Sequence, residues 1–135
     1  MRYAPYDAEY ALVGQMNDSQ VMEYFLTRVF ESEEVWSLDN KTEWITRELG
    51  EDTLLPVWPY EKYAQENSVG KWRDFEPSAT SLEDFVYNLL PALIGDDILL
   101  EIMPRDDKVG CIVSPQRLMS ILEGMLDAGE YTLDG

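Results

Sequence analysis

The chain contains no histidine among its 135 residues and only one cysteine, Cys111. Without histidine, it cannot carry a Ser-His-Asp or Cys-His nucleophile system or a zinc site with imidazole ligands. A single thiol also excludes an internal disulfide, a thiolate zinc site and an iron–sulfur cluster. Such sparse cysteine usage is typical of a protein in a reducing compartment.

Long apolar runs and glycine-rich loops are also missing. No apolar run approaches the roughly 20 residues that a membrane-spanning helix needs. The start of the chain, residues 1–7, lacks the apolar core of a signal peptide. Gly110, Gly124 and Gly129 are isolated, and no phosphate-binding fingerprint surrounds them. We therefore expect a cytoplasmic protein that does not bind membranes or use a standard nucleotide loop.

Basic residues are scarce. The chain has 10 Lys and Arg and 27 Asp and Glu, so its net charge is −17. Such a surface repels phosphate backbones and anionic lipid, so neither direct nucleic-acid contact nor membrane binding is expected. Two interpretations remain open. The acids form an ordinary solvated surface, or they form a face that docks a basic protein or mimics nucleic acid. Nothing in the composition indicates an oligomeric state.

The material for a core is present, since 45% of residues are hydrophobic and four are tryptophan. At this length a domain buries roughly two thirds of the surface that its unfolded chain exposes, so it needs no disulfide or metal to fold. No cofactor is expected. We expect a single domain over residues 1–135, with a variable N-terminal segment at 1–17 and a frayed tail at 130–135.

Hydrophobic periodicity predicts alternating helices and strands. Apolar stripes predict helices near 19–32, 60–66, 81–90 and 115–128. Alternation and β-branched residues predict one hairpin over 35–46 and another over 98–113, with a short or edge strand at 54–57. The predicted fold class is therefore α+β: an antiparallel or mixed sheet, two hairpins plus one short strand, covered by about four helices.

Capping residues and prolines mark the expected helix boundaries. Asn17, Asp18 and Ser19 are alternative N-caps for the first helix. Ser81 and Ser114 are suitable N-caps for the third and fourth helices, and Pro115 fits the first helical turn after Ser114. Pro91 should end or kink the third helix near residue 90. Residues 67–80 are predicted to form a connection.

The stretch Leu54–Tyr60 stands near the middle of the chain, with two prolines around its tryptophan. Pro56 has no N–H to donate, which disfavours a central strand and underlies the prediction of a short or edge strand. Pro59 favours an extended Trp58 and suits the start of a helix. We predict a strand-to-helix corner with Trp58 at the bend.

Aromatic residues around this corner are the candidate ligand- or partner-binding set: Trp58, Tyr60, Tyr63 and Trp72. Aromatic walls with polar tips suit small ligands or a partner's side chains. Ordinary core packing accounts for the same residues and is the commoner case. We also expect Trp72 and Phe75 to pin the 67–80 connection to the body of the domain. No catalytic residue is identified.

Carboxylates cluster at Asp96, Asp97 and Glu101, and again at Asp106 and Asp107. Their spacing matches no calcium loop, and aspartate is favoured in turns for backbone reasons alone. We therefore predict no metal site. Cys111 is interpreted as a small buried hydrophobic residue in a strand.

A family resemblance extends over about residues 19–126. The residues that carry it, in order, are Glu34–Leu38, Leu55–Pro59, Tyr63, Ala64, Trp72, Glu76, Pro77, Leu82, Phe85, Leu90, Pro91 and Val113–Pro115. With this pattern the chain resembles the domain of unknown function 2750 family of bacterial proteins. Relatives often carry histidine after the Trp-Pro pair, where this chain has Tyr60, so any histidine chemistry would be absent here. The family has no assigned activity.

Two hypotheses about function follow. The leading one is a non-enzymatic, cytoplasmic protein-binding module whose acidic surface meets a basic protein. The alternative is a small-ligand binder or enzyme that uses the aromatic corner of Trp58, Tyr60 and Trp72 together with carboxylates.

Overall fold

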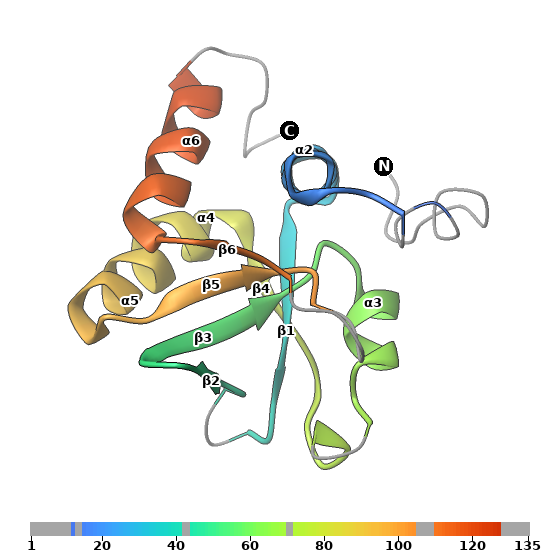
Figure 1. Ribbon diagram of the computed structural model, residues 1–135. Coiled ribbons are helices and arrows are strands. Elements are labelled where there is room, and N and C mark those ends of the chain that lie inside the picture. The colour runs from blue at the N-terminus through green and yellow to red at the C-terminus, as the bar shows by residue number, and fades with distance from the viewer. Residues whose placement is uncertain (1–11, 13–14, 42–43, 70–71, 105–109, 128–135) are drawn as a thin grey trace.

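The computed structural model describes residues 12, 15–41, 44–69, 72–104 and 110–127 (Figure 1). Most of the expected variable segment at 1–17, the tail at 130–135, and the acids Asp106 and Asp107 lie outside these residues.

The described elements confirm the α+β class. They follow in the order α2 (Asp18–Ser32), β1 (Glu34–Asp39), β2 (Arg47–Leu49), β3 (Asp52–Val57), α3 (Glu61–Glu66), β4 (Glu76–Ser81), α4 (Leu82–Asp84), the π-helical segment η2 (Phe85–Leu89), α5 (Leu90–Asp96), β5 (Leu99–Ile102), β6 (Cys111–Val113) and α6 (Pro115–Asp127).

The strands form two sheets. One has four strands in the order β2-β3-β5-β6, in which β3 and β5 are parallel and the other pairs antiparallel. The other is the antiparallel pair β1-β4. In Figure 1, β3 and β5 run toward β1, which stands across their carboxyl ends. An isolated bridge between Trp36 and Trp58 connects the two sheets at this point.

The first predicted hairpin, over 35–46, forms only in part. Asp39 and Trp44 make an isolated bridge, and the N–H of Ile45 donates to the carbonyl of Leu38 at 2.8 Å. The regular partner of β1 is instead β4, with Glu34 opposite Ser81 and Asp39 opposite Glu76. The prediction of a connection over 67–80 is therefore wrong for its last residues, because pairing with β1 imposes a strand that the polar sequence does not signal. The second predicted hairpin is confirmed as β5-β6.

Strand β3 is an inner strand, so the prediction of an edge strand is wrong. Proline is tolerated because β2 pairs with β3 only as far as Leu54, opposite Arg47. At Pro56, β5 is the only neighbouring strand among the described residues, and Glu101 is the residue opposite. The missing N–H therefore costs no hydrogen bond to a second strand.

The helix that contains Pro91 does not end there. Residues 82–96 continue as α4, η2 and α5, and the N–H of Leu90 donates to the carbonyl of Phe85, five residues back. Widening the helix by one residue before Pro91 accommodates the proline ring, which would clash with a carbonyl in a regular α-helix. Pro91 then lies in the first turn of α5.

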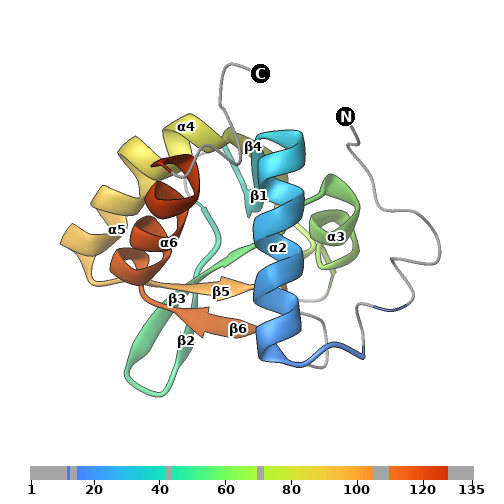
Figure 2. The ribbon, with the colours of Figure 1, turned by 90° about the horizontal axis from the view of Figure 1, so that it is seen from above.

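Of the three candidates before α2, Asn17 is the N-cap, and the predicted caps Ser81 and Ser114 are confirmed. Asn17 and Gln20 form a reciprocal capping box at the start of α2, and the hydroxyl of Ser81 accepts from the N–H of Asp84. The Ser114 hydroxyl accepts from the N–H of Arg117 at 3.1 Å, which fixes the start of α6. Figure 2 shows α2 and α6 on the same side of the β5-β6 pair.

Trp58 lies at the centre of the core. Its side chain is 1% exposed, and its indole N–H donates to the carbonyl of Pro104 at 3.0 Å. Its backbone N–H and carbonyl both pair with Trp36, each at 2.8 Å. The corner predicted from Pro56 and Pro59 is thus the point where β1, β3 and the end of β5 meet.

We predict that Trp58→Ala lowers the free energy of unfolding by roughly 3–5 kcal/mol, because it leaves a cavity and an unpaired carbonyl. Trp58→Phe should lose less, since most of the ring volume remains. Trp44→Ala is the matched control, because Trp44 is 37% exposed. Urea denaturation measures all three variants. A loss in Trp58→Ala no greater than in Trp44→Ala would contradict the central role of this side chain.

Candidate functional site

Three of the four predicted site residues are in the core. Trp58, Tyr60 and Tyr63 are all buried. The rings of Tyr60 and Tyr63 are stacked at 6.2 Å between centroids, and the hydroxyls of Tyr63 and Tyr24 are hydrogen-bonded at 2.8 Å. Trp72 is half-buried and lies elsewhere, in the wall of a surface hollow.

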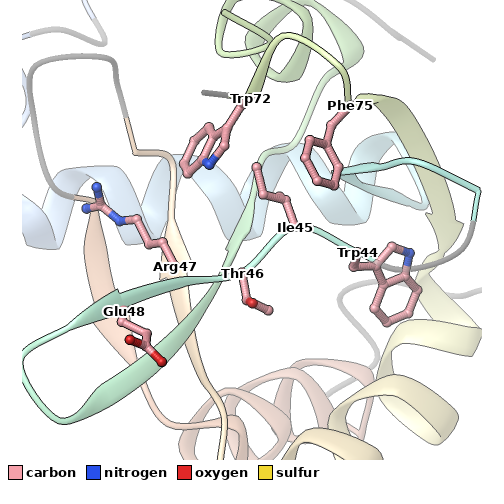
Figure 3. A pocket seen from close by; sticks show the side chains of 7 residues that line it. All are labelled: Trp44, Ile45, Thr46, Arg47, Glu48, Trp72 and Phe75. Carbon is pink, nitrogen blue, oxygen red and sulfur yellow. The ribbon is translucent and has the colours of Figure 1, made fainter. Parts of the chain in front are cut away.

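This hollow, called the Trp72 hollow below, has a volume of about 580 Å³. It is lined by residues 44–48 together with Trp72 and Phe75. In Figure 3 the side chains of Ile45 and Arg47 lie on the same side as Trp72 and Phe75, whereas those of Thr46 and Glu48 point the other way. The segment that enters β2 therefore presents one apolar and one cationic side chain to the two aromatic rings.

Arg47 is held by a buried acid. Its Nη2 donates to Oε2 of Glu101, a residue with no exposed surface. The backbone N–H of Gly110 donates to the same oxygen at 2.9 Å. Glu101 is thus a structural partner of Arg47. Their contact connects the outer strand β2 to β5. Glu101 does not join Asp96 and Asp97, which are exposed at the end of α5.

Gly110 is required by close approach of the backbone. A Cβ atom at this position would lie 2.4 Å from the carbonyl oxygen of Ile102 and 2.8 Å from the nitrogen of Pro104. Any side chain would push the 110 backbone away and remove its hydrogen bond to Glu101.

A double-mutant cycle tests the buried pair. Arg47→Met should lower the free energy of unfolding by roughly 3–5 kcal/mol, because it leaves the Glu101 carboxylate buried without its partner. Glu101→Leu should lower it less, because the Arg47 side chain is 22% exposed and keeps contact with water. The double variant should lose less than Arg47→Met, since no buried uncompensated charge remains. Additive losses in urea denaturation would show that the two side chains do not depend on each other.

A second hollow lies between α2, β6 and α6. It has a volume of about 560 Å³ and is called the β6 groove below. Its lining residues are Asp18, Ser19, Met22, Glu23, Leu26, Cys111, Ile112, Val113, Ser114, Arg117 and Ile121. No local sequence pattern indicates this groove, because its walls come from segments about ninety residues apart.

Cys111 lies in a strand and packs against the core, as predicted, but it is half-buried in this groove where a buried side chain was expected. Burial raises the pKa of its thiol, and the nearby Asp18 carboxylate raises the pKa further. The thiol therefore stays protonated and neutral at neutral pH, and it adds apolar surface to the groove.

Glu34, the first residue of β1, has a raised pKa. Burial is the main cause and the Glu61 carboxylate the second, and the ordinary value is 4.5. An acid with a raised pKa in the folded state binds more protons folded than unfolded. Its contribution to stability is therefore lost as pH rises from about 4.5 through the folded pKa.

We predict that Glu34→Gln raises the free energy of unfolding at neutral pH, and that this gain shrinks as pH falls toward 4.5. Glu66→Gln removes the same charge from an exposed position and controls for the general relief of acidic repulsion. Urea denaturation at neutral and acidic pH gives the comparison. An equal gain in both variants would assign the effect to net charge rather than to Glu34.

The described residues include no candidate membrane span and no candidate metal cluster. None of the described helices is both long and apolar enough to cross a membrane. Within the same part of the chain, no three His, Cys, Asp or Glu side chains are grouped so that they could hold a metal ion.

Fold and surface together define a small, acidic α+β protein with a filled aromatic corner and open hollows beside β2 and β6. The chain belongs to the family described as Protein of unknown function (DUF2750), whose profile matches residues 22–122. The match extends from α2 into α6 and confirms the resemblance seen in the sequence. No curated protein matches the chain.

Proposed function

We propose that this chain is a non-enzymatic, cytoplasmic protein-binding module whose acidic surface docks a basic protein partner. The observation that carries the proposal is the net charge of −17. Glu101 is the only buried acid among the described residues, so their acidic charge lies almost entirely at the surface. A field of this strength accelerates encounter with cationic partners and disfavours anionic ones.

The aromatic corner supports a binding module over an enzyme built at that corner. Trp58 and Tyr60 are the largest of the fully buried side chains among the described residues. Their surfaces are occupied by the core, so they are not available to hold a substrate. The surfaces that remain accessible to a partner are the surface acids, the Trp72 hollow and the β6 groove.

The Trp72 hollow favours a second candidate, the binding of a small ligand. Its volume of about 580 Å³ lies within the range of ordinary ligand pockets. Trp44, Trp72 and Phe75 offer ring surfaces to a planar apolar molecule. If a small ligand binds in the Trp72 hollow, Trp72 contacts that ligand, whereas Trp58 and Tyr60 only support the fold.

The leading proposal predicts salt-sensitive capture of a basic protein. The immobilised chain, incubated at low ionic strength with lysate of its source cells, should retain a cationic protein that high salt releases. An unrelated folded protein of similar net charge is the control, because any strong acid binds basic proteins weakly. Retention of the same proteins by the control, or of none by this chain, would overturn the proposal.

A further inference from the structure

The described sheets have four outer strands, β1, β2, β4 and β6, and they differ in how they are protected. The second edge of β1 is covered in part by isolated bridges from Trp36 to Trp58 and from Asp39 to Trp44. Outer strands pair with other chains unless charges, prolines or bulges prevent it. β2 carries Arg47 and Glu48, and β4 carries Glu76 and Pro77. β6, with the sequence Cys-Ile-Val, has neither a charge nor a proline.

The side chains of β6 also depart from the usual pattern of an outer strand. Ile112, at its centre, is 41% exposed although it is a large apolar residue. The only described strand partner of β6 is β5, opposite residues 100–102. In the part of the chain that the structure describes, no strand pairs with the other edge of β6, which lies beside exposed apolar surface.

The β6 groove continues this surface. Met22 and Leu26 contribute apolar side chains from α2, and Ile121 contributes one from α6. Figure 2 shows β6 running below and between these two helices. An extended segment laid beside β6 would have its apolar side chains against these three residues.

The charges around the groove indicate what kind of segment would bind. Asp18 and Glu23 line it on the α2 side, and Arg117 lines it at the start of α6. Acids therefore outnumber bases in the lining, as they do in the whole chain. Lysine or arginine side chains that alternate with apolar ones would meet Asp18 and Glu23.

We propose that the β6 groove binds an extended, cationic segment of a protein partner, which adds a strand to the free edge of β6. This inference rests on the proposed function and specifies the surface that carries it. Backbone hydrogen bonds with β6 supply affinity, and alternate side chains supply specificity through the apolar groove and its acids. A second copy of this chain is a poorer occupant, because each copy carries a net charge of −17.

A model peptide of alternating lysine and valine tests the proposal, with an alternating glutamate and valine peptide as the charge control. Isothermal titration at low ionic strength should show binding of the lysine peptide only. Ile112→Lys should weaken this binding about tenfold or more, a loss typical of one well-placed contact. Leu49→Lys is the matched control, because Leu49 is 42% exposed and lies in the opposite outer strand, β2. Both changes alter the net charge equally.

The single cysteine gives a second readout. Saturating lysine-valine peptide should slow the labelling of Cys111 by iodoacetamide, because Cys111 begins β6 and lines the groove. Undiminished labelling, together with equal weakening in Ile112→Lys and Leu49→Lys, would overturn this inference. Such a result would leave the proposed function intact, since the peptide would then bind another part of the acidic surface.

Two further outcomes would also overturn strand addition. One is tighter binding of a helix-forming leucine and lysine peptide of equal charge, which would make the occupant a helix. The other is a doubled mass in light scattering without peptide that Ile112→Lys restores to a monomer, which would make the occupant a second copy. Circular dichroism and thermal melts of both variants establish that they fold.

Discussion

The indole and backbone of Trp58 together form the junction on which the rest of the structure depends. The backbone pairs in both directions with Trp36 of β1, and the indole N–H reaches Pro104, just beyond β5. One residue thus connects the two-stranded sheet to the four-stranded sheet and closes the end of β5. The prolines on either side restrict the backbone so that Trp58 leaves β3 and turns into the region before α3. Neither the Trp72 hollow nor the β6 groove is lined by Trp58.

Much of the fold was predictable because its signals are local. The helices are marked by apolar stripes and by the caps Asn17, Ser81 and Ser114, and the β5-β6 hairpin joins neighbouring segments. The pairing of β1 with β4 was not predictable, because the polar sequence of β4 has no strand alternation and its partner lies about forty residues earlier. Pro56 and Pro91 misled for a related reason. Each is accommodated by its neighbours, through the early end of β2 pairing and the π-helical turn.

The candidate sites were likewise predictable only where their sequence signals are local. The aromatic residues near Trp58 were identifiable, but the sequence alone did not distinguish core from surface, and three of the four lie in the core. Trp72 does line a hollow, yet its neighbours Trp44 and Arg47 come from a distant segment. Arg47 in turn depends on Glu101, 54 residues later, a contact for which there is no local signal. The β6 groove was not predicted, because the sequence of β6 is typical of an ordinary buried strand.

The proposed binding role rests on the surplus of acids and on the β6 strand, which has neither a charge nor a proline. The most direct measurement is an amide map of the isotope-labelled chain by nuclear magnetic resonance, with and without the lysine-valine peptide. Strand addition predicts that the largest shift changes and new protection from hydrogen exchange fall on Cys111–Val113, with smaller changes near Asp18 and Ile121. Changes spread over the exposed acids, or concentrated at the Trp72 hollow, would contradict the account.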